Sequence, residues 1–382
     1  MSQSKISING PINYIKLQNK DKEVHLFFDY HEELEYQQKC DSFDSVDINN
    51  FIAQVLLKTD KDIDFFAEIF KKQLKTDYEF NVNDIYIMNV RKMFNNIYNK
   101  KEKKNIRLHY IDIRDYNSFI KHGIDTLPNI STNIIDNEQT VDDDTELFIQ
   151  ELQQVQSDIE RLLKYSNHIL EKNKEKLVLN KKHQEYYHLL EKMLIRYNDN
   201  NIKDKLQELY IKFCLKPFEK VIELIKETTK LLDKEYNKYL KWGDNKKPII
   251  IEKDKDGFIY NNMYEYPQMS KETYNKIVEN IKDIEGLYDE AICLIMDTYF
   301  LRRLLDKTYV KKSIVFTGGD HCRNYLWILV KYFNFEINTI FFVRDYSKEE
   351  FEKYIHTVKN PVLLDKVLRP DGLKQCVTIN EI

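Results

Sequence analysis

The apolar positions of the first 125 residues alternate between two periods. Three short apolar runs predict strands, at 24–28, 63–70 and 106–113. Between them, apolar residues at helical spacing predict two amphipathic helices, at 48–57 and 85–97. Because strands that alternate with helices pair in parallel through right-handed crossovers, residues 1–125 are expected to form the first half of an α/β domain.

The pattern changes after residue 125. Residues 126–140 are rich in Asn, Thr and Asp and predict a polar linker. From Asp144, a residue type that caps helices, apolar residues recur at helical spacing to Tyr239, and Pro217 is expected to kink or stop one of these helices. We therefore expect a linker and a helical insertion over 126–245.

The α/β pattern resumes over 246–382. A long helix is expected first, followed by strands at 313–317 and 337–343 with a helix at 323–333 between them. Ser347 is expected to cap a last helix, and the chain to end as a short extended tail. The whole pattern predicts an α/β fold with a mostly parallel sheet flanked by helices and a long all-helical insertion.

Composition narrows the fold class. The chain of 382 residues is 42% hydrophobic and 13% aromatic, which excludes a disordered protein and predicts an aromatic-rich core. Only 8 glycines and 7 prolines are present, and this scarcity disfavours hairpin-rich all-β folds. Helices and parallel strands are therefore favoured.

Charge and hydropathy bear on partners and location. The 59 basic and 63 acidic residues are spread evenly and give a net charge of −4, so we expect no nucleic-acid partner. No run of about 18 apolar residues is present, and residues 1–15 are polar without an apolar signal core, so we expect neither a membrane span nor secretion. The expected location is the cytoplasm or the inside of a virion.

The cysteines are odd in number, far apart and without CxxC spacing: Cys40, Cys214, Cys293, Cys322 and Cys376. This arrangement predicts neither a disulfide framework nor a zinc ribbon, and it favours a reducing compartment. Cys40 and Cys322 are expected to be inert thiols.

Polar groups stand at the ends of four predicted strands. In open parallel α/β sheets, ligands bind just beyond the carboxyl ends of the strands. The residues that this rule selects are Asp29 and His31, Glu68, Asp112 and Arg114, and Gly318, Gly319, Asp320 and His321. We expect these side chains to lie close together.

The residue types at these positions suit hydrolysis or metal binding. Histidine near neutral pH serves as a general base or a metal ligand, and carboxylates ligate a metal or orient an imidazole. The expected catalytic residues are His31, Glu68, Asp112 and His321. The expected ligands of a divalent metal are His31, Asp29, Glu68, His321 and Asp320.

A substrate anion or carbonyl is expected at the turn after the strand at 313–317. Gly318 and Gly319 allow positive φ and close approach of the backbone, and the helix that begins near Arg323 presents free N–H groups. The expected substrate-binding residues are therefore Arg114, Gly318, Gly319 and Arg323.

Several of these residues also have a purely structural interpretation. Asp320 and Gly319 belong to types that are common in turns and at helix N-caps. Glu68 could lie in water on an edge strand, and Arg114 could belong only to an ion-pair network. His25, inside the first strand, is expected to be a core histidine with its hydrogen bonds satisfied.

The order of a strand with a histidine-bearing turn, a strand ending in Glu and a strand ending in Asp resembles the erythromycin-esterase-like, ChaN-like and TraB/TIKI-type superfamily. The resemblance lies in the segments VHLFFDYHEELE, DIDFFAEIF and IRLHYIDIRD. In addition, SIVFTGGDHCRNYLWILVKYF resembles the superfamily's GxxH turn and following helix. This resemblance implies that His31, Glu68, Asp112 and His321 share a pocket in which the histidines and the Glu bind a metal or activate water. The first turn departs from the pattern, with Phe28 where the superfamily has glycine.

The chain also resembles uncharacterised proteins of large nucleocytoplasmic DNA viruses, in the segments FFDYHEELEYQQKC and HYIDIRDY and in overall composition. For a viral protein, the expected location becomes the host-cell cytoplasm or the virion.

Two hypotheses follow from these features. The first is a metal-assisted or acid/base hydrolase, which requires His31, His321 and Glu68 to lie within about one ligand shell of each other. The second is a catalytically inactive virion-structural or host-interaction scaffold, whose helices over 141–245 bind a protein partner or self-associate. The scaffold requires an exposed apolar stripe on those helices.

Overall fold

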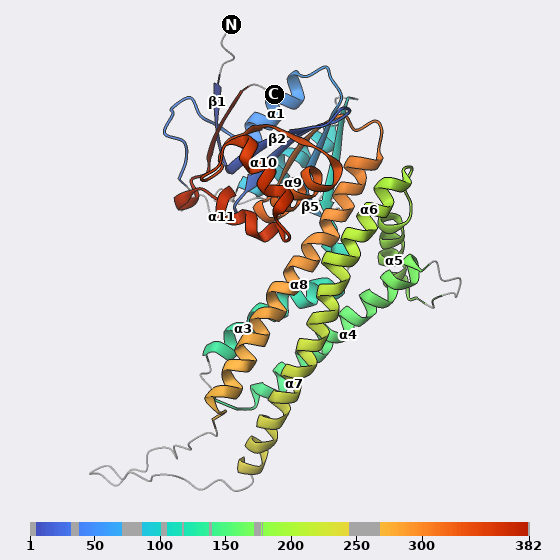
Figure 1. The fold of residues 1–382 in the computed structure, drawn as a ribbon, viewed down its shortest axis with the longest axis vertical. Coiled ribbons are helices and arrows are strands. Elements are labelled where there is room, and N and C mark those ends of the chain that lie inside the picture. Colours follow the sequence, from blue (N-terminus) through green and yellow to red (C-terminus); the bar gives the residue numbers. More distant parts are fainter. Residues whose placement is uncertain are drawn as a thin grey trace, which may run out of the picture. The chain divides into compact units, whose positions relative to one another are not determined.

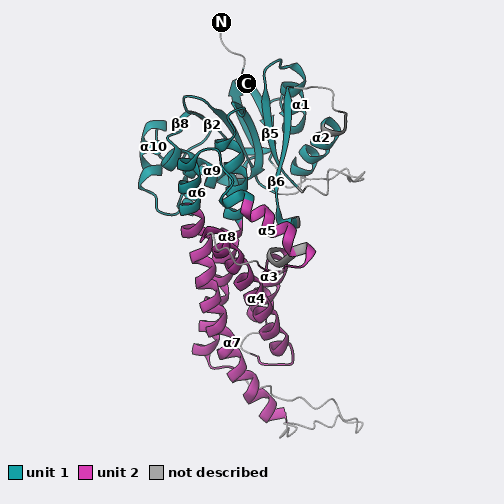
Figure 2. Cartoon of the chain, turned by 90° about the vertical axis from the view of Figure 1, so that its right-hand side faces the viewer, with its two compact units in different colours: residues 1–116, 192–208, 293–382 teal, residues 117–191, 209–292 magenta. Residues whose placement is uncertain are grey.

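The computed structural model describes most of the chain. The described residues are 5–31, 38–70, 86–100, 105–116, 118–136, 140–171, 177, 179–243 and 268–380. They divide into two compact units, which Figure 2 distinguishes by colour. Unit 1 comprises residues 1–116, 192–208 and 293–382, and unit 2 comprises residues 117–191 and 209–292.

The larger sheet belongs to unit 1. Its strands among the described residues are β2 (Pro11–Gln18), β3 (Glu23–Asp29), β5 (Ile63–Phe70), β6 (Ile106–Asp112), β7 (Lys312–Gly318) and β8 (Glu336–Ile340). Their order across the sheet is β6-β5-β7-β3-β2-β8. The first four strands of this order run parallel, whereas β2 pairs antiparallel with both β3 and β8. The predicted α/β class is confirmed, and the sheet is largely parallel but mixed.

Helices cover both faces of this sheet. Adjacent residues of a strand point to opposite faces, and the ring of Phe65 packs against Phe94 of α2 (Tyr86–Lys100), with ring centroids 5.7 Å apart. The ring of Phe66 instead packs against Phe300 of α8 (Lys271–Asp306), at 5.0 Å. Because both faces are buried, β3, β5 and β7 are mostly apolar, as parallel strands at the centre of a sheet require, and their polar residues, such as His25 and Glu68, are buried.

The strand β2 was not predicted. The scarcity of Gly and Pro argues against hairpins, yet β2 and β3 form one. Its turn is built by Asn19, whose side-chain oxygen accepts hydrogen bonds from the backbone N–H groups of Asp21 and Lys22. An Asx turn of this kind needs no glycine.

A second, smaller sheet contains the predicted tail. Its order is β4-β1-β9, with β1 at Lys5–Asn9, β4 at Val46–Asp47 and β9 at Cys376–Asn380. The end of the chain is thus a strand, antiparallel to β1, rather than a free extended tail.

The prediction of no disulfide was wrong. Cys40 and Cys376 are disulfide-bonded, with their Cα atoms 5.0 Å apart. The pairing of β1 with β9 sets Cys376 opposite Asn9, and the Asn9 side-chain oxygen accepts a hydrogen bond from the Cys40 N–H. The two cysteines therefore meet through a strand pairing that their spacing of 336 residues does not reveal. Disulfides are rare in reducing compartments, so the cysteines no longer favour such a compartment.

The helices of unit 1 flank these sheets. The longer ones include α1 (Ile48–Lys58), α2, α9 (Gly319–Phe333) and α10 (Lys348–Thr357), and short helical segments are η3 (Arg114–Tyr116), η5 (Pro361–Leu364), α11 (Asp365–Leu368) and η6 (Asp371–Leu373). The predicted cap of α10 is confirmed, because Ser347 forms a capping box with Glu350. The helix α9 begins at Gly319, earlier than the predicted start at Arg323, so Asp320 and His321 lie in its first turn.

Unit 2 is helical. Its elements are α3 (Ser118–Asp136), α4 (Asp144–Leu170), most of α5 (Lys181–Leu194), the end of α6 (Asn200–Tyr210), a π-helical segment η4 (Ile211–Leu215), α7 (Lys216–Gly243) and the first part of α8. The helices α4 and α7 lie side by side (Figure 1), and the hydroxyls of Tyr236 and Tyr239 in α7 donate to Glu146 and Asp143. Pro217 does not end the chain's helical path, because η4 carries it from α6 into α7.

The predicted linker over 126–140 was wrong for most of its length, because α3 extends to Asp136. The buried residues Leu127, Ile130 and Ile134 follow helical spacing, so the polar residues between them occupy the exposed face of an amphipathic helix. None of the helices in the described part of the chain is long and apolar enough to cross a membrane.

Candidate functional site

The carboxyl ends of β3, β5 and β7 bring together a histidine, two carboxylates and a backbone N–H. His31 Nδ1 lies 2.6 Å from Asp29 Oδ2, and His31 Nε2 lies 3.6 Å from Glu68 Oε2. The N–H of Gly318 donates to the same Glu68 oxygen at 3.0 Å. These contacts follow from the strand order, because Asp29 and Gly318 are paired neighbours on β3 and β7. We call Asp29, His31, Glu68, Asp112, Arg114 and Gly318 the strand-end cluster.

Gly318 leaves room for this approach. A Cβ atom at this position would lie 3.3 Å from His31 Nε2 and 3.5 Å from Glu68 Oε2. The predicted positive φ is wrong, because Gly318 has φ −49° and ψ 147°. The glycine therefore matters for space rather than for backbone conformation. At Gly319 a Cβ would make only an ordinary contact, 3.5 Å from the Asp29 carbonyl oxygen.

Arg114 closes the other side of the cluster. Its guanidinium makes two close contacts with the buried Asp112 carboxylate, Nε to Oδ1 at 3.0 Å and NH2 to Oδ2 at 2.6 Å. The same NH2 group lies 3.1 Å from Glu68 Oε1. A second arginine that was not predicted, Arg91 of α2, donates from Nε to the Glu68 backbone oxygen at 2.7 Å. Glu68 is thus surrounded by cationic groups.

Glu68 is buried, and its carboxylate is ionised. It is 4% exposed on a strand that lies between β6 and β7, so the alternative of an edge strand in water is wrong. Burial by itself raises the pKa of Glu68, but the hydrogen bond of His31 and the charges of His321, His31 and Arg114 hold the pKa well below its ordinary value.

His31 is protonated at neutral pH. Partial burial lowers its pKa, but the hydrogen bonds and charges of Asp29 and Glu68 outweigh that effect and raise the pKa of His31 to about 10. Its side chain is 41% exposed, which leaves the imidazolium accessible from solvent. The predicted neutral imidazole is therefore replaced by a cation held between two carboxylates.

His321 has its own carboxylate partner, which the sequence analysis missed. His321 Nδ1 lies 2.7 Å from Oδ1 of Asp297 in α8, and Asn324 donates to Asp297 Oδ2 at 2.7 Å. Burial lowers the pKa of His321, but Asp297 and Glu68 raise it above its ordinary value. Asp297 is fully buried in an apolar stretch of α8, and a carboxylate in such a stretch is the signal that could have identified it.

Asp320 and Arg323 lie in a separate ion-pair group. The Asp320 carboxylate lies 2.8 Å from Arg323 and 3.0 Å from Arg369, and Arg323 also lies 2.6 Å from Asp365. None of the contacts in this group involves His31 or Glu68. The prediction for His25 is confirmed, because its two ring nitrogens lie 2.8 Å from Tyr14 and Glu23.

The strand-end cluster does not fit a divalent metal. His31 Nδ1 is held by Asp29, and the Glu68 oxygens contact Gly318 and Arg114. A guanidinium in contact with the carboxylate opposes a cation at the same place. Among the described residues, no group of three or more His, Cys, Asp or Glu side chains could hold a metal ion.

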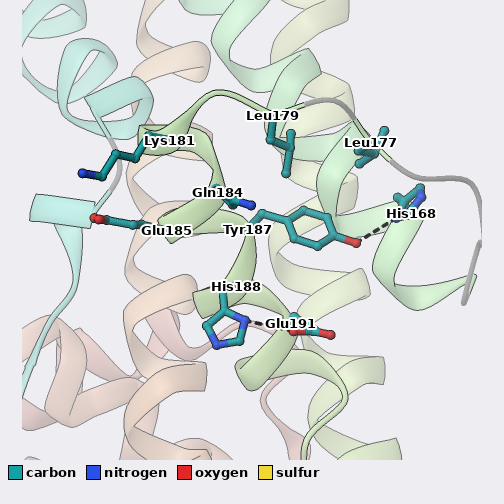
Figure 3. A pocket seen from close by; sticks show the side chains of 9 residues that line it. All are labelled: His168, Leu177, Leu179, Lys181, Gln184, Glu185, Tyr187, His188 and Glu191. Atoms are coloured by element: carbon teal, nitrogen blue, oxygen red, sulfur yellow. Dashed lines mark hydrogen bonds and ion pairs between the residues drawn. The ribbon is translucent and has the colours of Figure 1, made fainter.

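A cavity of about 640 Å³ lies in unit 2 and is lined by residues of α4 and α5 and by Leu177 and Leu179. Figure 3 shows Tyr187 reaching from α5 toward His168 of α4, whose Nδ1 lies 2.8 Å from the Tyr187 hydroxyl. Below them, His188 Nδ1 lies 3.1 Å from Glu191 Oε2. None of the residues predicted for the site lines this cavity.

Comparison with known proteins places the chain among viral relatives. A family of unknown function (DUF5847) matches residues 6–382. Uncharacterized protein R706 of Acanthamoeba polyphaga mimivirus is 25% identical over 98% of this chain and 95% of its own length, and uncharacterized protein R160 of the same virus is 28% identical over 97% and 94%. No solved structure matches. These matches confirm the resemblance to giant-virus proteins and do not support the esterase-like resemblance.

Proposed function

Because the chain belongs to DUF5847, a family of unknown function, we propose its activity from the strand-end cluster and from His321: an acid/base hydrolase that uses His31, Glu68 and His321. A metal ion takes no part in the proposed reaction. Since the relatives are mimivirus proteins, we expect the activity to act in an infected host cell or in a virion.

The observation that carries the proposal is that His31 contacts the buried carboxylate of Glu68, and that His31 and His321 each have a buried aspartate partner. Each histidine contacts a buried Asp through Nδ1, His31 with Asp29 at 2.6 Å and His321 with Asp297 at 2.7 Å. An Asp at Nδ1 fixes the orientation of the ring and leaves Nε2 to exchange protons with a substrate. Both histidines also act on Glu68 and lower its pKa.

The raised pKa of His31 assigns it the role of a proton donor. With a pKa of about 10, His31 carries a proton at neutral pH, and its partly exposed ring can deliver that proton from Nε2 to a leaving oxygen or nitrogen. This role differs from the predicted general base. Glu68, with its low pKa, is a poor base but a good acceptor that orients water.

The proposed reaction has two steps, addition of water and departure of the leaving group. Water, oriented by Glu68, adds to a carbonyl carbon of the substrate, while the cations of His31 and Arg114 stabilise the negative oxygen that forms. The leaving group departs with the proton of His31. The proton that the added water loses returns to His31, which regenerates the imidazolium.

The four residues that the esterase-like resemblance selects interact with one another, although the comparisons with known proteins do not support the resemblance itself. That resemblance selects His31, Glu68, Asp112 and His321, and contacts or charge interactions link all four in unit 1. Phe28, which replaces the superfamily's glycine, is buried within β3 and leaves the contact between His31 and Glu68 in place. This arrangement supports the proposal.

The test is turnover of a panel of ester, amide and phosphoester substrates in the presence of a chelator. The variants are His31→Ala, Glu68→Gln and His321→Ala, with His356→Ala as the control, because His356 is an exposed histidine of α10. We expect wild type and control to turn over one substrate class, and His31→Ala to lose about 100-fold or more of that rate. Absence of turnover in wild type, or equal rates in all variants, would contradict the hydrolase.

The scaffold alternative has less support. The exposed large apolar residues that the structure describes in the helices of 141–245 are Leu147 in α4, Ile211 in η4 and Leu240 in α7. They lie on three different elements, and scattered apolar residues are ordinary on protein surfaces. Self-association through these helices is checked by the molar mass of the protein in solution over a range of concentrations.

A further inference from the structure

A cleft of about 630 Å³ lies in unit 1, at the opposite ends of the parallel strands from His31 and Glu68. Ile63 and Lys312, the first residues of β5 and β7, line it, together with parts of β1 and α1. Strands rise by about 3.3 Å per residue, so the length of β7 separates Lys312 from Gly318 by about 20 Å. The cleft is therefore distinct from the strand-end cluster. We call it the Lys58 cleft.

Part of the lining of the Lys58 cleft is apolar, and we call this part its floor. Ile6, Val46 and Val55 line it, and these partly buried side chains pack against the core cluster that Phe51 and Ile63 belong to. The cleft is thus an opening onto the edge of the hydrophobic core. Covering such a surface with an apolar group is favourable by about 25 cal/mol per Å².

The rim of the cleft is basic. Four lysines line it, Lys5, Lys58, Lys61 and Lys312, against one acidic residue, Asp44. Lys312 is paired with Glu23 at 3.3 Å. Within the described part of the chain, the ammonium groups of the other three lysines make no ion pair or hydrogen bond. Three unneutralised ammonium groups around an apolar floor complement a molecule with an apolar body and an anionic head.

Phe43 belongs to a loop that lines part of the cleft. It is fully exposed, and it lies between Ser42 and Asp44, which both line the cleft. Its loop is held in place by the Cys40–Cys376 disulfide and by the hydrogen bond from Asn9 to Ser45 at 3.2 Å. Since its neighbours Ser42 and Asp44 line the cleft, Phe43 is available to contact a ligand bound there.

We infer that the Lys58 cleft binds a small amphipathic anion of the fatty-acid type, with its hydrocarbon chain on Ile6, Val46 and Val55 and its carboxylate at the lysine rim. The volume suits a small ligand. This site does not depend on the proposed hydrolase, because it shares no residue with the strand-end cluster.

The experiment measures binding of laurate and of the uncharged dodecanol to the full chain by calorimetry. The test variant is Lys58→Gln/Lys61→Gln, and the matched control is Lys353→Gln/Lys359→Gln, which removes the same charge from exposed lysines elsewhere in unit 1. We expect wild type to bind laurate at a single saturable site and more tightly than dodecanol. The test variant should bind laurate about tenfold more weakly and the control within about twofold of wild type, since each exposed ion pair contributes modestly. A third variant, Val55→Asp, puts a carboxylate on the apolar part of the cleft and should abolish the binding of laurate.

Three results would overturn the inference. The first is that wild type shows no saturable binding of laurate. The second is that laurate and dodecanol bind equally and the lysine substitutions change neither, which would leave an apolar surface without anion selectivity. The third is that wild type binds vesicles of anionic phospholipid but not free laurate, which would make the lysines and Phe43 a membrane-contact surface. Thermal unfolding of each variant shows whether a loss of binding reflects a loss of folding.

Discussion

His31 Nε2 and Glu68 Oε2 lie 3.6 Å apart at the ends of two strands that are not hydrogen-bonded to each other. The strand between them is β7, and its last residue, Gly318, donates its N–H to the same oxygen. A buried carboxylate thus receives a backbone N–H from one strand and an imidazolium from the next. This places the protonated imidazole of His31 at the carboxyl end of the sheet. It also makes the stability of the fold depend on the protonation of His31.

The first prediction is that raising the pH weakens the fold through His31. Below the ordinary histidine pKa of 6.5, His31 is protonated in both folded and unfolded chains, so the stabilisation by Asp29 and Glu68 is complete. Between 6.5 and about 10 the unfolded chain loses this proton while the folded chain keeps it. The free energy of unfolding should therefore fall as the pH rises through this range.

Urea unfolding at about pH 6, 8 and 10 measures this effect. His31→Ala should show a smaller decline than wild type, whereas His356→Ala, which removes an exposed histidine, should keep the full decline. Identical declines in wild type and His31→Ala would show that the His31 ion pair does not survive in solution.

The central strands and their ends could be predicted because both depend on local sequence. A strand that is buried on both faces is mostly apolar, as the segment from Val24 to Phe28 shows, and the polar residue that follows it then stands at the ligand-binding edge. This reasoning reached Asp29, His31 and Glu68. It could not show that β7 lies between β3 and β5, because that pairing joins distant parts of the chain.

The strand β2 and the carboxylate of Asp297 escaped prediction for a common reason. The buried Asn13 makes β2 look polar, but its amide donates to the backbone oxygens of Phe342 and Leu368 and accepts from the Phe342 N–H. Asp297 is likewise satisfied by His321 and Asn324. A buried polar group is tolerated only with such partners, and its partners come from segments that no local pattern connects to it.

The second prediction is that Asp297 positions His321. Asp297→Asn keeps the size of the side chain but removes the charge that raises the pKa of His321. We expect the pKa of His321 to fall, and the kcat of the proposed reaction to drop by about tenfold with little change in KM, because Asp297 acts through His321 and not on the substrate. NMR titration of the imidazole measures the pKa directly. An unchanged pKa of His321 in Asp297→Asn would contradict the proposed role of Asp297.

The third prediction is that a larger residue at position 318 weakens the contact between His31 and Glu68. In Gly318→Ala the new Cβ lies 3.3 Å from His31 Nε2, so the imidazole or Glu68 must shift and the contact between them weakens. Turnover and the pKa of His31 should both fall, and stability should drop by about 1 kcal/mol.

Gly286→Ala is the matched control for Gly318→Ala. No atom lies within 4 Å of a Cβ at Gly286, which lies in the interior of α8. Replacing a glycine inside a helix with alanine should raise stability by about 0.5–1 kcal/mol. If Gly318→Ala behaved like Gly286→Ala, the close packing around His31 would be refuted.

The fourth prediction concerns the Cys40–Cys376 disulfide, which joins the loop before β4 to β9 across 336 residues. It closes a loop that contains nearly the whole chain, and such a link should stabilise the fold by about 2–4 kcal/mol by restricting the unfolded state. Cys40→Ala/Cys376→Ala, or reduction of the wild type, should lower the midpoint of urea unfolding. Cys322→Ala, at a buried thiol outside the disulfide, controls for the loss of a cysteine as such.

Counting thiols in the denatured protein before and after reduction measures the disulfide itself. Two additional thiols are expected after reduction, and no increase would show that Cys40 and Cys376 are not bonded. Because residues 42, 44 and 46 of the same loop line the Lys58 cleft, reduction should also weaken laurate binding while leaving the pKa of His31 unchanged.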